Sequence, residues 1–415
     1  MDKTPLITND AVVLGMLFLI LAFVFYTSAI QTRGWKRFYQ IFPTVLLCYF
    51  LPSLLNSFGI IDGEKSQLYP VVIKYLLPVS LVLLTIGVDF KSLKRLGPKA
   101  LIMFFTASFG VMIGGPIAVL ICRRIEPSLF NGTGSDELWR GLVAIAGSWI
   151  GGGPNQAAMK ELFKPSDQLF SAMITLDVVV SYIWMAILLY GASRADAIDK
   201  KFKADNTAIE SLRVKMESFQ HSVRRITTLK DLVLIFAVGF GISGISHFCA
   251  DIIAPLIQQH APQLERFSLT SSFFWLVVIA TTLGLILAGT PVRKLEGAGA
   301  SSVGSLLLYV MIATIGMKMD ISAIFKIPSL LLVGGVWILL HIIIMFMVAK
   351  LIKAPFFFTA VGSMANIGGP ASAPVVASAF SPSLAPVGII LAVLGYAIGT
   401  YAAYLCGLMM QWASS

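Results

Sequence analysis

The chain has 415 residues, of which 57% are hydrophobic and 13% are charged, and its formal net charge is +10. This composition excludes a soluble globular protein and is typical of a polytopic membrane protein. The positive charge does not indicate a nucleic-acid partner, because the Lys and Arg residues lie in short loops between apolar runs, where they orient the chain in a bilayer. We expect a multi-pass integral protein of a prokaryotic cytoplasmic membrane.

Twelve apolar segments approach the length of about 20 residues that a helix needs to cross a bilayer. They cover approximately residues 11–30, 41–61, 69–88, 99–122, 139–162, 168–192, 229–249, 270–289, 299–317, 328–349, 355–379 and 386–410. The first has no cationic region before it and no cleavage site after it, so we expect it to remain as a helix. The sequence therefore predicts an all-α membrane protein.

One long polar stretch, residues 193–228, separates two halves of six segments each, residues 1–192 and 229–415. Its mixed charges predict a solvated helix or linker. The third and ninth segments, one in each half, both end near a Thr-Ile-Gly tripeptide, within residues 81–93 and 310–324. In each half an ordinary span, an interrupted segment and a last span follow, which predicts a repeat of about half the chain.

The two interrupted segments, residues 139–162 and 355–379, contain glycine and proline where a continuous helix is least stable. Residues 147–163 read GSWIGGGPNQAAMKELF and residues 362–380 read GSMANIGGPASAPVVASAF. Glycine costs a helix interior about 1 kcal/mol and proline about 3 kcal/mol relative to alanine, so residues 151–154 disfavour a helix by about 6 kcal/mol. One such stretch is also consistent with close helix packing or a kink. Two matched stretches in corresponding halves indicate the substrate site of a secondary transporter.

The positions of Lys and Arg distinguish two topologies. If every segment crosses the bilayer, 12 of the counted basic residues lie inside; if both interrupted segments return to the face that they entered from, 20 do. The positive-inside rule favours the second arrangement, with ten crossings, two re-entrant segments, a cytoplasmic linker and inverted halves. Because non-helical backbone at membrane depth must be covered by protein or line a water-filled cavity, we expect the two tips to meet near the midplane.

The order of these motifs resembles the cation/proton antiporter and anion transporter superfamily, which includes sodium/glutamate and 2-hydroxycarboxylate symporters. Within it, GSWIGGGPNQAAM and ANIGGPASAP most resemble the YjcL-like membrane proteins of unassigned function. The resemblance covers nearly the whole chain and implies an inverted-repeat transporter of the elevator type, commonly a homodimer. The first tip reads GGGPNQ and lacks the GGHGT of the glutamate symporters, so the resemblance does not supply the substrate.

Polar residues beside both interruptions are the candidates for substrate binding: Ser148, Asn155, Gln156, Asn366 and Ser372. Amides and hydroxyls supply donors and acceptors. Unwound backbone supplies carbonyl ligands for Na⁺, and half-helix N-termini attract carboxylates. The set predicts a site for a small anion or zwitterion taken up with Na⁺. Taken alone, each asparagine is also consistent with an interhelical hydrogen bond that contributes about 0.6–2 kcal/mol.

Asp177 lies well inside the sixth segment, where a carboxylate costs at least about 2.5 kcal/mol by insertion scales. By the resemblance, this is the span in which the antiporters of the superfamily carry their ion-binding aspartate. The ion-coupling candidates are Asp177, Thr175, Ser181, Gly152 and Gly368. We expect Na⁺, if it binds, at Asp177, Thr175 and Asn155. The structural alternative is a protonated Asp177 bonded to a neighbouring helix.

Other polar residues in apolar segments receive smaller roles. His341 is isolated in the tenth segment, so a packed, hydrogen-bonded residue is favoured over a proton relay. Lys74 and Asp89 are expected at the membrane boundary. The four cysteines, expected to be buried thiols without the spacing of a zinc site or a disulfide framework, are Cys48, Cys122, Cys249 and Cys406.

The sequence has no phosphate-binding loop, HExxH motif or nucleophile elbow, so neither an ATP-driven pump nor an enzyme is expected. We expect a secondary active transporter that carries a small organic anion, amino acid or peptide-like solute with Na⁺ or H⁺ by alternating access. The alternative is a Na⁺/H⁺-type antiporter without an organic substrate. One acid among amides favours the symporter. No cofactor other than the coupling ion is expected.

Overall fold

The structure is a computed structural model that describes residues 5–42, 44–63, 65–204, 209, 227–267, 269–318, 327–381 and 384–415. Over these residues the chain is helical, and the only β pairing in this part is one isolated bridge between Ile7 and Ile61. The expected all-α class is therefore confirmed. Most of the predicted linker, including residues 210–226, and residues 319–324 of the second Thr-Ile-Gly stretch lie outside the described residues.

Each predicted apolar segment contains a helix. The first half has α1 (Asp10–Ala29), α2 (Arg33–Ile41), α3 (Thr44–Ser57), α4 (Leu68–Ile86), α5 (Phe90–Leu96), α6 (Pro98–Ile125), α7 (Leu138–Phe163), α8 (Asp167–Ala192) and α9 (Ala195–Phe202). The second half has α11 (Leu229–His260), α12 (Ser272–Ala288), η4 (Pro291–Ala298), α13 (Ala300–Gly316), α14 (Ile327–Leu351), α15 (Phe356–Ile367), α16 (Gly369–Phe380) and α17 (Ala385–Ser414). Short 3-10 helices η1 (Pro127–Phe130), η2 (Gly134–Asp136) and η3 (Pro262–Phe267) lie in connections.

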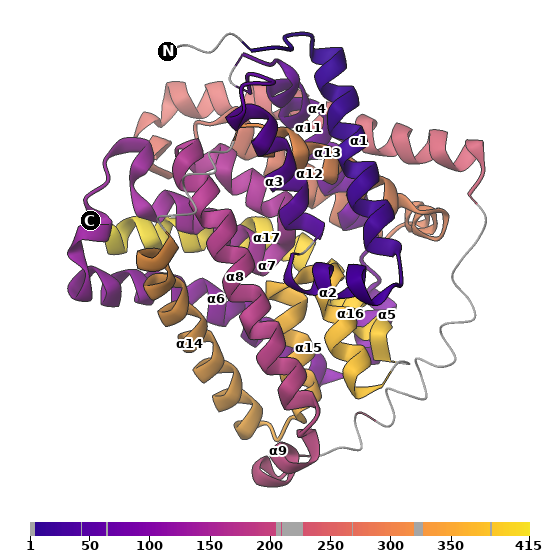
Figure 1. Cartoon of the computed structure of the whole chain (residues 1–415), viewed down its shortest axis with the longest axis vertical. Coiled ribbons are helices and arrows are strands. Elements are labelled where there is room, and N and C mark those ends of the chain that lie inside the picture. Colours follow the sequence, from indigo (N-terminus) through magenta and orange to yellow (C-terminus); the bar gives the residue numbers. More distant parts are fainter. Residues whose placement is uncertain are drawn as a thin grey trace.

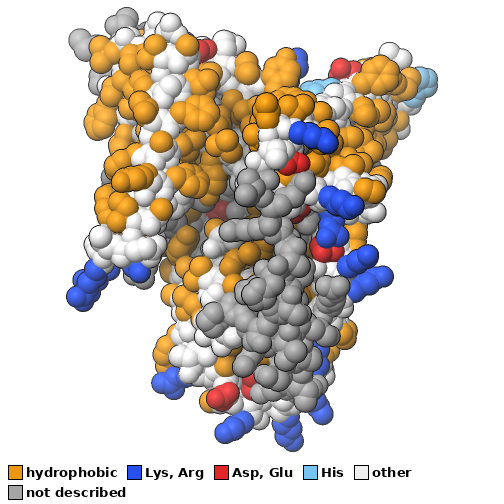
Figure 2. All heavy atoms as spheres, turned by 90° about the vertical axis from the view of Figure 1, so that its right-hand side faces the viewer, with side chains coloured by type: hydrophobic (Ala, Val, Ile, Leu, Met, Phe, Trp, Pro, Cys, Tyr) orange, Lys and Arg blue, Asp and Glu red, His pale blue; other side chains and the backbone are white. Residues whose placement is uncertain are grey.

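Seven of the described helices are long and apolar enough to cross a membrane: α1, α4, α6, α8, α11, α14 and α17. An eighth is obtained if α12 is joined to η4, which bends away from it by 94°. At about 1.5 Å per residue, the 17 residues of α12 or α13 extend over about 26 Å, slightly less than a hydrocarbon core of about 30 Å. Figure 2 shows hydrophobic side chains over much of the face in view, with Lys and Arg mainly near its edges. The chain is thus a multi-pass membrane protein.

The helices pack in two groups (Figure 1). The first bundle consists of α1, α3, α4, α11, α12 and α13, and the second bundle consists of α6, α7, α8, α14, α15, α16 and α17. Contacts within each bundle are far more extensive than contacts between them. Each half of the chain contributes its first three apolar segments to the first bundle and its last three to the second.

The first interrupted segment folds back on itself as a helical hairpin. Gly152 divides α7, because its φ of 70° and ψ of −173° are not helical. The Arg140 guanidinium, near the start of α7, donates a hydrogen bond of 2.9 Å to the carbonyl of Phe163 at its end. In a straight helix these residues would be about 35 Å apart. The two parts of α7 therefore lie side by side.

The second interrupted segment turns back in the same way. Gly368 separates α15 from α16, and Gly369 has a positive φ of 59°. The rings of Phe356, at the start of α15, and Phe380, at the end of α16, have centroids 6.0 Å apart. Both interruptions expected from glycine and proline are present, and both segments form helical hairpins.

The first hairpin is held against α17 by a close approach of two backbones. A Cβ atom on Gly399 would lie 2.3 Å from the Cα atom of Gly151, and one on Gly151 would lie 2.6 Å from the Cα atom of Gly399. Any side chain at either position would separate the two helices. Glycine at both positions thus lets the tip of the hairpin reach the middle of the second bundle.

The cysteines are free thiols, as expected, but Cys249 on α11 is half-buried, whereas the other three are buried. The expectation that all four cysteines are buried is therefore wrong for Cys249. The reason is its helix, since α11 packs on few neighbours and leaves much of its apolar surface exposed.

Candidate functional site

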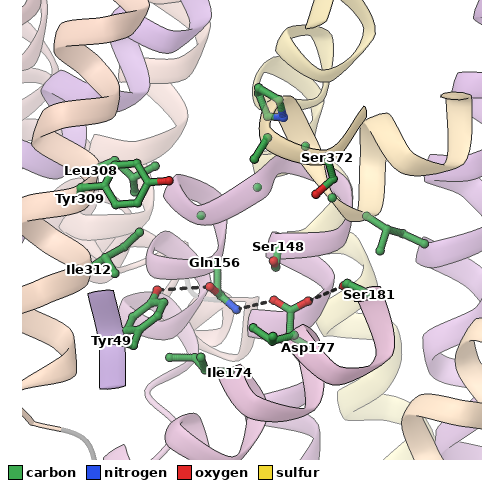
Figure 3. Close-up of a pocket in the computed structure, with 18 of the residues that line it drawn as sticks. Tyr49, Ser148, Gln156, Ile174, Asp177, Ser181, Leu308, Tyr309, Ile312 and Ser372 are labelled. Atoms are coloured by element: carbon green, nitrogen blue, oxygen red, sulfur yellow. Dashed lines mark hydrogen bonds between the residues drawn. The ribbon is translucent and has the colours of Figure 1, made fainter. Parts of the chain in front are cut away.

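A cavity of about 300 Å³ lies between the two bundles and is lined by both hairpin tips (Figure 3). The second bundle lines it with Ser148, Gly152, Gly153, Gln156, Ile174, Asp177, Val178, Ser181, Tyr182, residues 367–372 and Tyr396. The first bundle lines it with Tyr49, Ser305, Leu308, Tyr309 and Ile312. The size is at the lower end of the range of small-molecule pockets.

Asp177 is surrounded by hydrogen-bond donors. Its Oδ1 accepts from Trp149 Nε1 at 2.6 Å and from the Ser181 hydroxyl at 3.1 Å, and its Oδ2 accepts from Gln156 Nε2 at 3.0 Å. Ser148 lies beside the carboxylate on the cavity wall (Figure 3). Donors favour the charged carboxylate, whereas burial, with 8% of the residue exposed, opposes it. The charged form of Asp177 is thus stabilised by its donors and destabilised by burial, and a bound cation or proton would change this balance.

Gln156 connects Asp177 to the other bundle. Its Nε2 donates to Asp177, and its Oε1 accepts from the Tyr49 hydroxyl on α3 at 3.4 Å (Figure 3). Gln156 lies one turn after the break at Gly152, and its side chain lines the cavity. A hydrogen-bond chain thus runs from the first bundle through the first hairpin to α8.

The structure brings most of the predicted site residues together. Those that line the cavity are Ser148, Gln156, Ser372, Asp177, Ser181, Gly152 and Gly368. Those that do not line it are Asn155, Asn366 and Thr175. The predicted meeting of the two tips is present, because both line the same cavity.

Asn155 is fully buried and bonded within the second bundle. Its Nδ2 donates to the carbonyls of Gly151 at 2.9 Å and Tyr396 at 3.3 Å, and its Oδ1 accepts from the Thr400 hydroxyl at 2.5 Å. These bonds join the unwound tip to α17. In this structure the amide therefore positions the first tip and does not reach the cavity.

Asn366 has the corresponding place in the second hairpin. Its Nδ2 donates to the carbonyls of Gly362 at 3.0 Å and Phe104 at 3.2 Å, and its Oδ1 accepts from the Ser108 hydroxyl at 2.7 Å. The second tip is thereby joined to α6. Each asparagine bonds to a carbonyl of its own hairpin and to one neighbouring helix.

The expected Na⁺ ligands do not all face the cavity. Of Asp177, Thr175 and Asn155, only Asp177 lines it. The Thr175 hydroxyl donates to the Ser171 carbonyl at 3.1 Å, within its own helix. If Na⁺ binds in this cavity, the oxygens available among the lining residues are those of Asp177, Gln156, the serine and tyrosine hydroxyls and the backbone of the tips.

The sequence profile of a family described as "Protein of unknown function (DUF819)" matches residues 15–412. The chain belongs to this family. A relative that is 23% identical over 373 residues, which is 87% of each chain, is "Uncharacterized membrane protein YjcL" of Bacillus subtilis (strain 168). The expected resemblance to YjcL-like membrane proteins is therefore confirmed.

His341 in this family member is fully buried on α14. Its Nε2 lies 2.7 Å from the Ser363 hydroxyl of the second hairpin, which also accepts from Trp184 Nε1 at 2.8 Å. It does not line the cavity. This is the packed, hydrogen-bonded role that the sequence favours.

Asp89 precedes α5 and makes a bidentate ion pair with Arg293 of η4. Both guanidinium nitrogens lie 2.9 Å from its carboxylate, and the Ser92 hydroxyl donates to it at 2.6 Å. Burial alone would raise the pKa of Asp89, but the hydrogen bonds from Ser92 and the charge of Arg293 outweigh it and hold the pKa below its ordinary value of 3.8. Asp89 thus has a structural role as the ion-pair partner of Arg293, in the connection between α4 and α5.

A charged cluster, named here the Asp167 network, joins the bundles away from the cavity. Asp167 at the start of α8 pairs with Lys160 of α7 at 2.8 Å and with Lys318, which follows α13, at 3.2 Å. Lys160 Nζ also donates to the Tyr69 hydroxyl on α4 at 2.8 Å, and Tyr69 in turn bonds to Glu161. Two residues of the first bundle are thus tied to three of the second.

Sequence reasoning missed the aromatic residues of the site and the Asp167 network. Trp149 lies between Ser148 and the first tip, so its position in the interrupted segment could have marked it as a site residue. The tyrosines that line the cavity, Tyr49, Tyr182, Tyr309 and Tyr396, come from four separate helices. No local pattern marks them, because only the packing of the bundles brings them together.

Proposed function

We propose that this protein is a secondary active transporter that moves a small solute by alternating access. The observation that carries the proposal is one cavity, between two bundles, lined by the tips of two helical hairpins and by Asp177. Interrupted membrane helices at the boundary of two repeats are the usual substrate site of such carriers. Movement of one bundle against the other would expose the cavity to each face in turn.

The proposal includes inverted halves and a cytoplasmic linker. Contacts between charged loops support it: Asp89 pairs with Arg293 at 2.9 Å, and Lys99 Nζ donates to the Lys353 carbonyl at 3.3 Å. If every apolar segment crossed the bilayer, each pair would lie on opposite faces of the membrane. With both interrupted segments returning, each pair lies on the cytoplasmic face. An elevator movement, a homodimer and a prokaryotic cytoplasmic membrane are proposed from the superfamily resemblance.

Asp177 is the proposed coupling group. An uncompensated charge inside the membrane is energetically costly. Binding of Na⁺ or H⁺ to the carboxylate would therefore change which occupied states of the carrier can move the site from one membrane face to the other. On this proposal the chain is a carrier and not an enzyme, and the coupling ion is its only cofactor. Na⁺/H⁺ antiport without an organic solute is the second candidate, because the cavity holds a carboxylate that can exchange a cation for a proton; the amide of Gln156 beside it and the apolar and hydroxyl-bearing walls favour a carrier of a solute.

The test is uptake into proteoliposomes of amino acids, dicarboxylates and small peptides, with and without Na⁺ and pH gradients. At least one solute should accumulate only when an ion gradient is present. If Na⁺ is coupled, Asp177→Asn should raise the Na⁺ concentration for half-maximal uptake; if H⁺ is coupled, the variant should lose accumulation but keep solute exchange. Ion exchange with no solute uptake would favour the second candidate. Accumulation by Asp177→Asn with unchanged ion dependence would make the carboxylate structural.

A further inference from the structure

The cavity has one charged side chain. Among the described residues that line it, Asp177 is the only Asp, Glu, Lys, Arg or His. A solute that carries only negative charge would meet this carboxylate with no basic side chain beside it to offset the repulsion. A positively charged group on the solute would instead compensate a buried anion.

Four tyrosines share the cavity with this carboxylate. Tyr49 and Tyr309 approach from the first bundle, and Tyr182 and Tyr396 from the second; Figure 3 shows the first two across the cavity from Asp177. The face of a tyrosine ring attracts cations, more strongly when water is excluded. A carboxylate with tyrosines nearby, whose hydroxyl oxygens accept hydrogen bonds and whose rings attract cations, is a combination that can recognise an ammonium group.

The hairpin tips make a zwitterion acceptable as well. The second parts of both hairpins begin at the cavity, where Gly153 and the first turn of α16, up to Ser372, line it. Backbone N–H groups in a first helical turn have no partner within the helix and favour a carboxylate. The cavity thus offers a negative side chain at α8 and partial positive charge at the tips.

We propose, on the basis of the transport function proposed above, that the solute of this cavity carries a primary ammonium group that binds at Asp177 among the tyrosines. The class comprises amino acids, small peptides and related amines. Anions without an amino group are excluded from it. The ammonium group donates to the carboxylate oxygens of Asp177 in competition with the present donors, Gln156 among them. Its binding therefore also alters the hydrogen bond between Gln156 and Tyr49 across the bundles.

The experiment compares isosteric ligands on the full-length protein in lipid nanodiscs. Thermal unfolding is followed by tryptophan fluorescence in sodium chloride and, separately, in potassium chloride of the same ionic strength, because a ligand that binds the folded state raises the unfolding temperature. One set is alanine, alaninamide, lactate and lactamide, and a second is built in the same way on leucine. Within each set the amino group is replaced by hydroxyl and the carboxylate by amide.

The expected result is a rise in unfolding temperature with an amino acid or its amide and none with the hydroxy acid or hydroxy amide. Asp177→Asn should weaken binding by about tenfold or more, the effect of losing one charged hydrogen bond. Asp251→Asn is the control, since Asp251 lies exposed on α11, away from the cavity. A shift caused by the hydroxy acid and not by the amino amide would overturn the ammonium assignment, and so would no shift with any of the eight compounds. Either result leaves the transport proposal to its own uptake test.

Discussion

Removal of the Lys318 ammonium from the Asp167 network should loosen the contact between the two bundles. Lys318 Nζ lies 3.2 Å from Asp167 Oδ2, with 17% of the lysine side chain and 31% of the aspartate side chain exposed. A hydrogen bond to a charged group contributes about 1.5–3 kcal/mol, and partial solvent screening reduces this to about 1–2 kcal/mol. The present arrangement of the bundles should therefore lose a factor of about 5–30 in population relative to other arrangements.

The assay is the distance distribution between spin labels at Gln67→Cys, which precedes α4, and Thr133→Cys, which precedes α7, in a background without the native cysteines. Lys318→Met should add a second distance or enlarge an existing minor one. Asp167→Asn should act similarly. The effect of the double variant should be smaller than the sum of the two single effects, because each single variant already removes the Asp167–Lys318 pair.

Lys350→Met is the matched control, because this lysine is exposed at the end of α14 in the second bundle. It should leave the distribution unchanged. If Lys318→Met also gives the distribution of the unmodified protein, the network does not hold the bundles together and the reasoning is wrong.

Three further predictions follow from the topology, the hairpins and the boundary ion pair. Impermeant thiol reagents should label Lys201→Cys only from the cytoplasm and Thr133→Cys only from outside; labelling of the former from outside intact cells would exclude the cytoplasmic linker. Asn155→Ala and Asn366→Ala should abolish transport at low substrate concentration and also lower the unfolding temperature, since each truncation leaves buried partners unpaired at about 1–3 kcal/mol per group. Near-normal uptake by both variants at matched expression would show that neither amide is needed. Asp89→Asn should destabilise the protein at about pH 7, and the destabilisation should shrink as the pH falls below the ordinary carboxyl pKa of 3.8 towards the lowered pKa of the folded state; a difference in unfolding temperature that does not change with pH would contradict this.

The sequence by itself determined the class of protein and the places where its helices break. Composition and the length of the apolar segments are properties of the chain, and every predicted segment contains a helix. The interruptions at Gly152 and Gly368 were also predictable, because the cost of glycine and proline in a helix is local and does not depend on the neighbours. The presence of Asp177 inside a span marked it as a site residue for the same reason, since burial of a carboxylate in a membrane is costly wherever it occurs.

Only the tertiary structure decided which polar groups face the cavity. Asn155 and Gln156 are adjacent, and successive residues of a helix point about 100° apart. The sequence does not decide which of the two faces the cavity; packing against α17 directs Asn155 to Thr400 and leaves Gln156 for Asp177 and Tyr49. The tyrosines of the cavity were equally inaccessible to sequence reasoning, because Tyr49 and Gln156 are 107 residues apart and meet only where the two bundles touch.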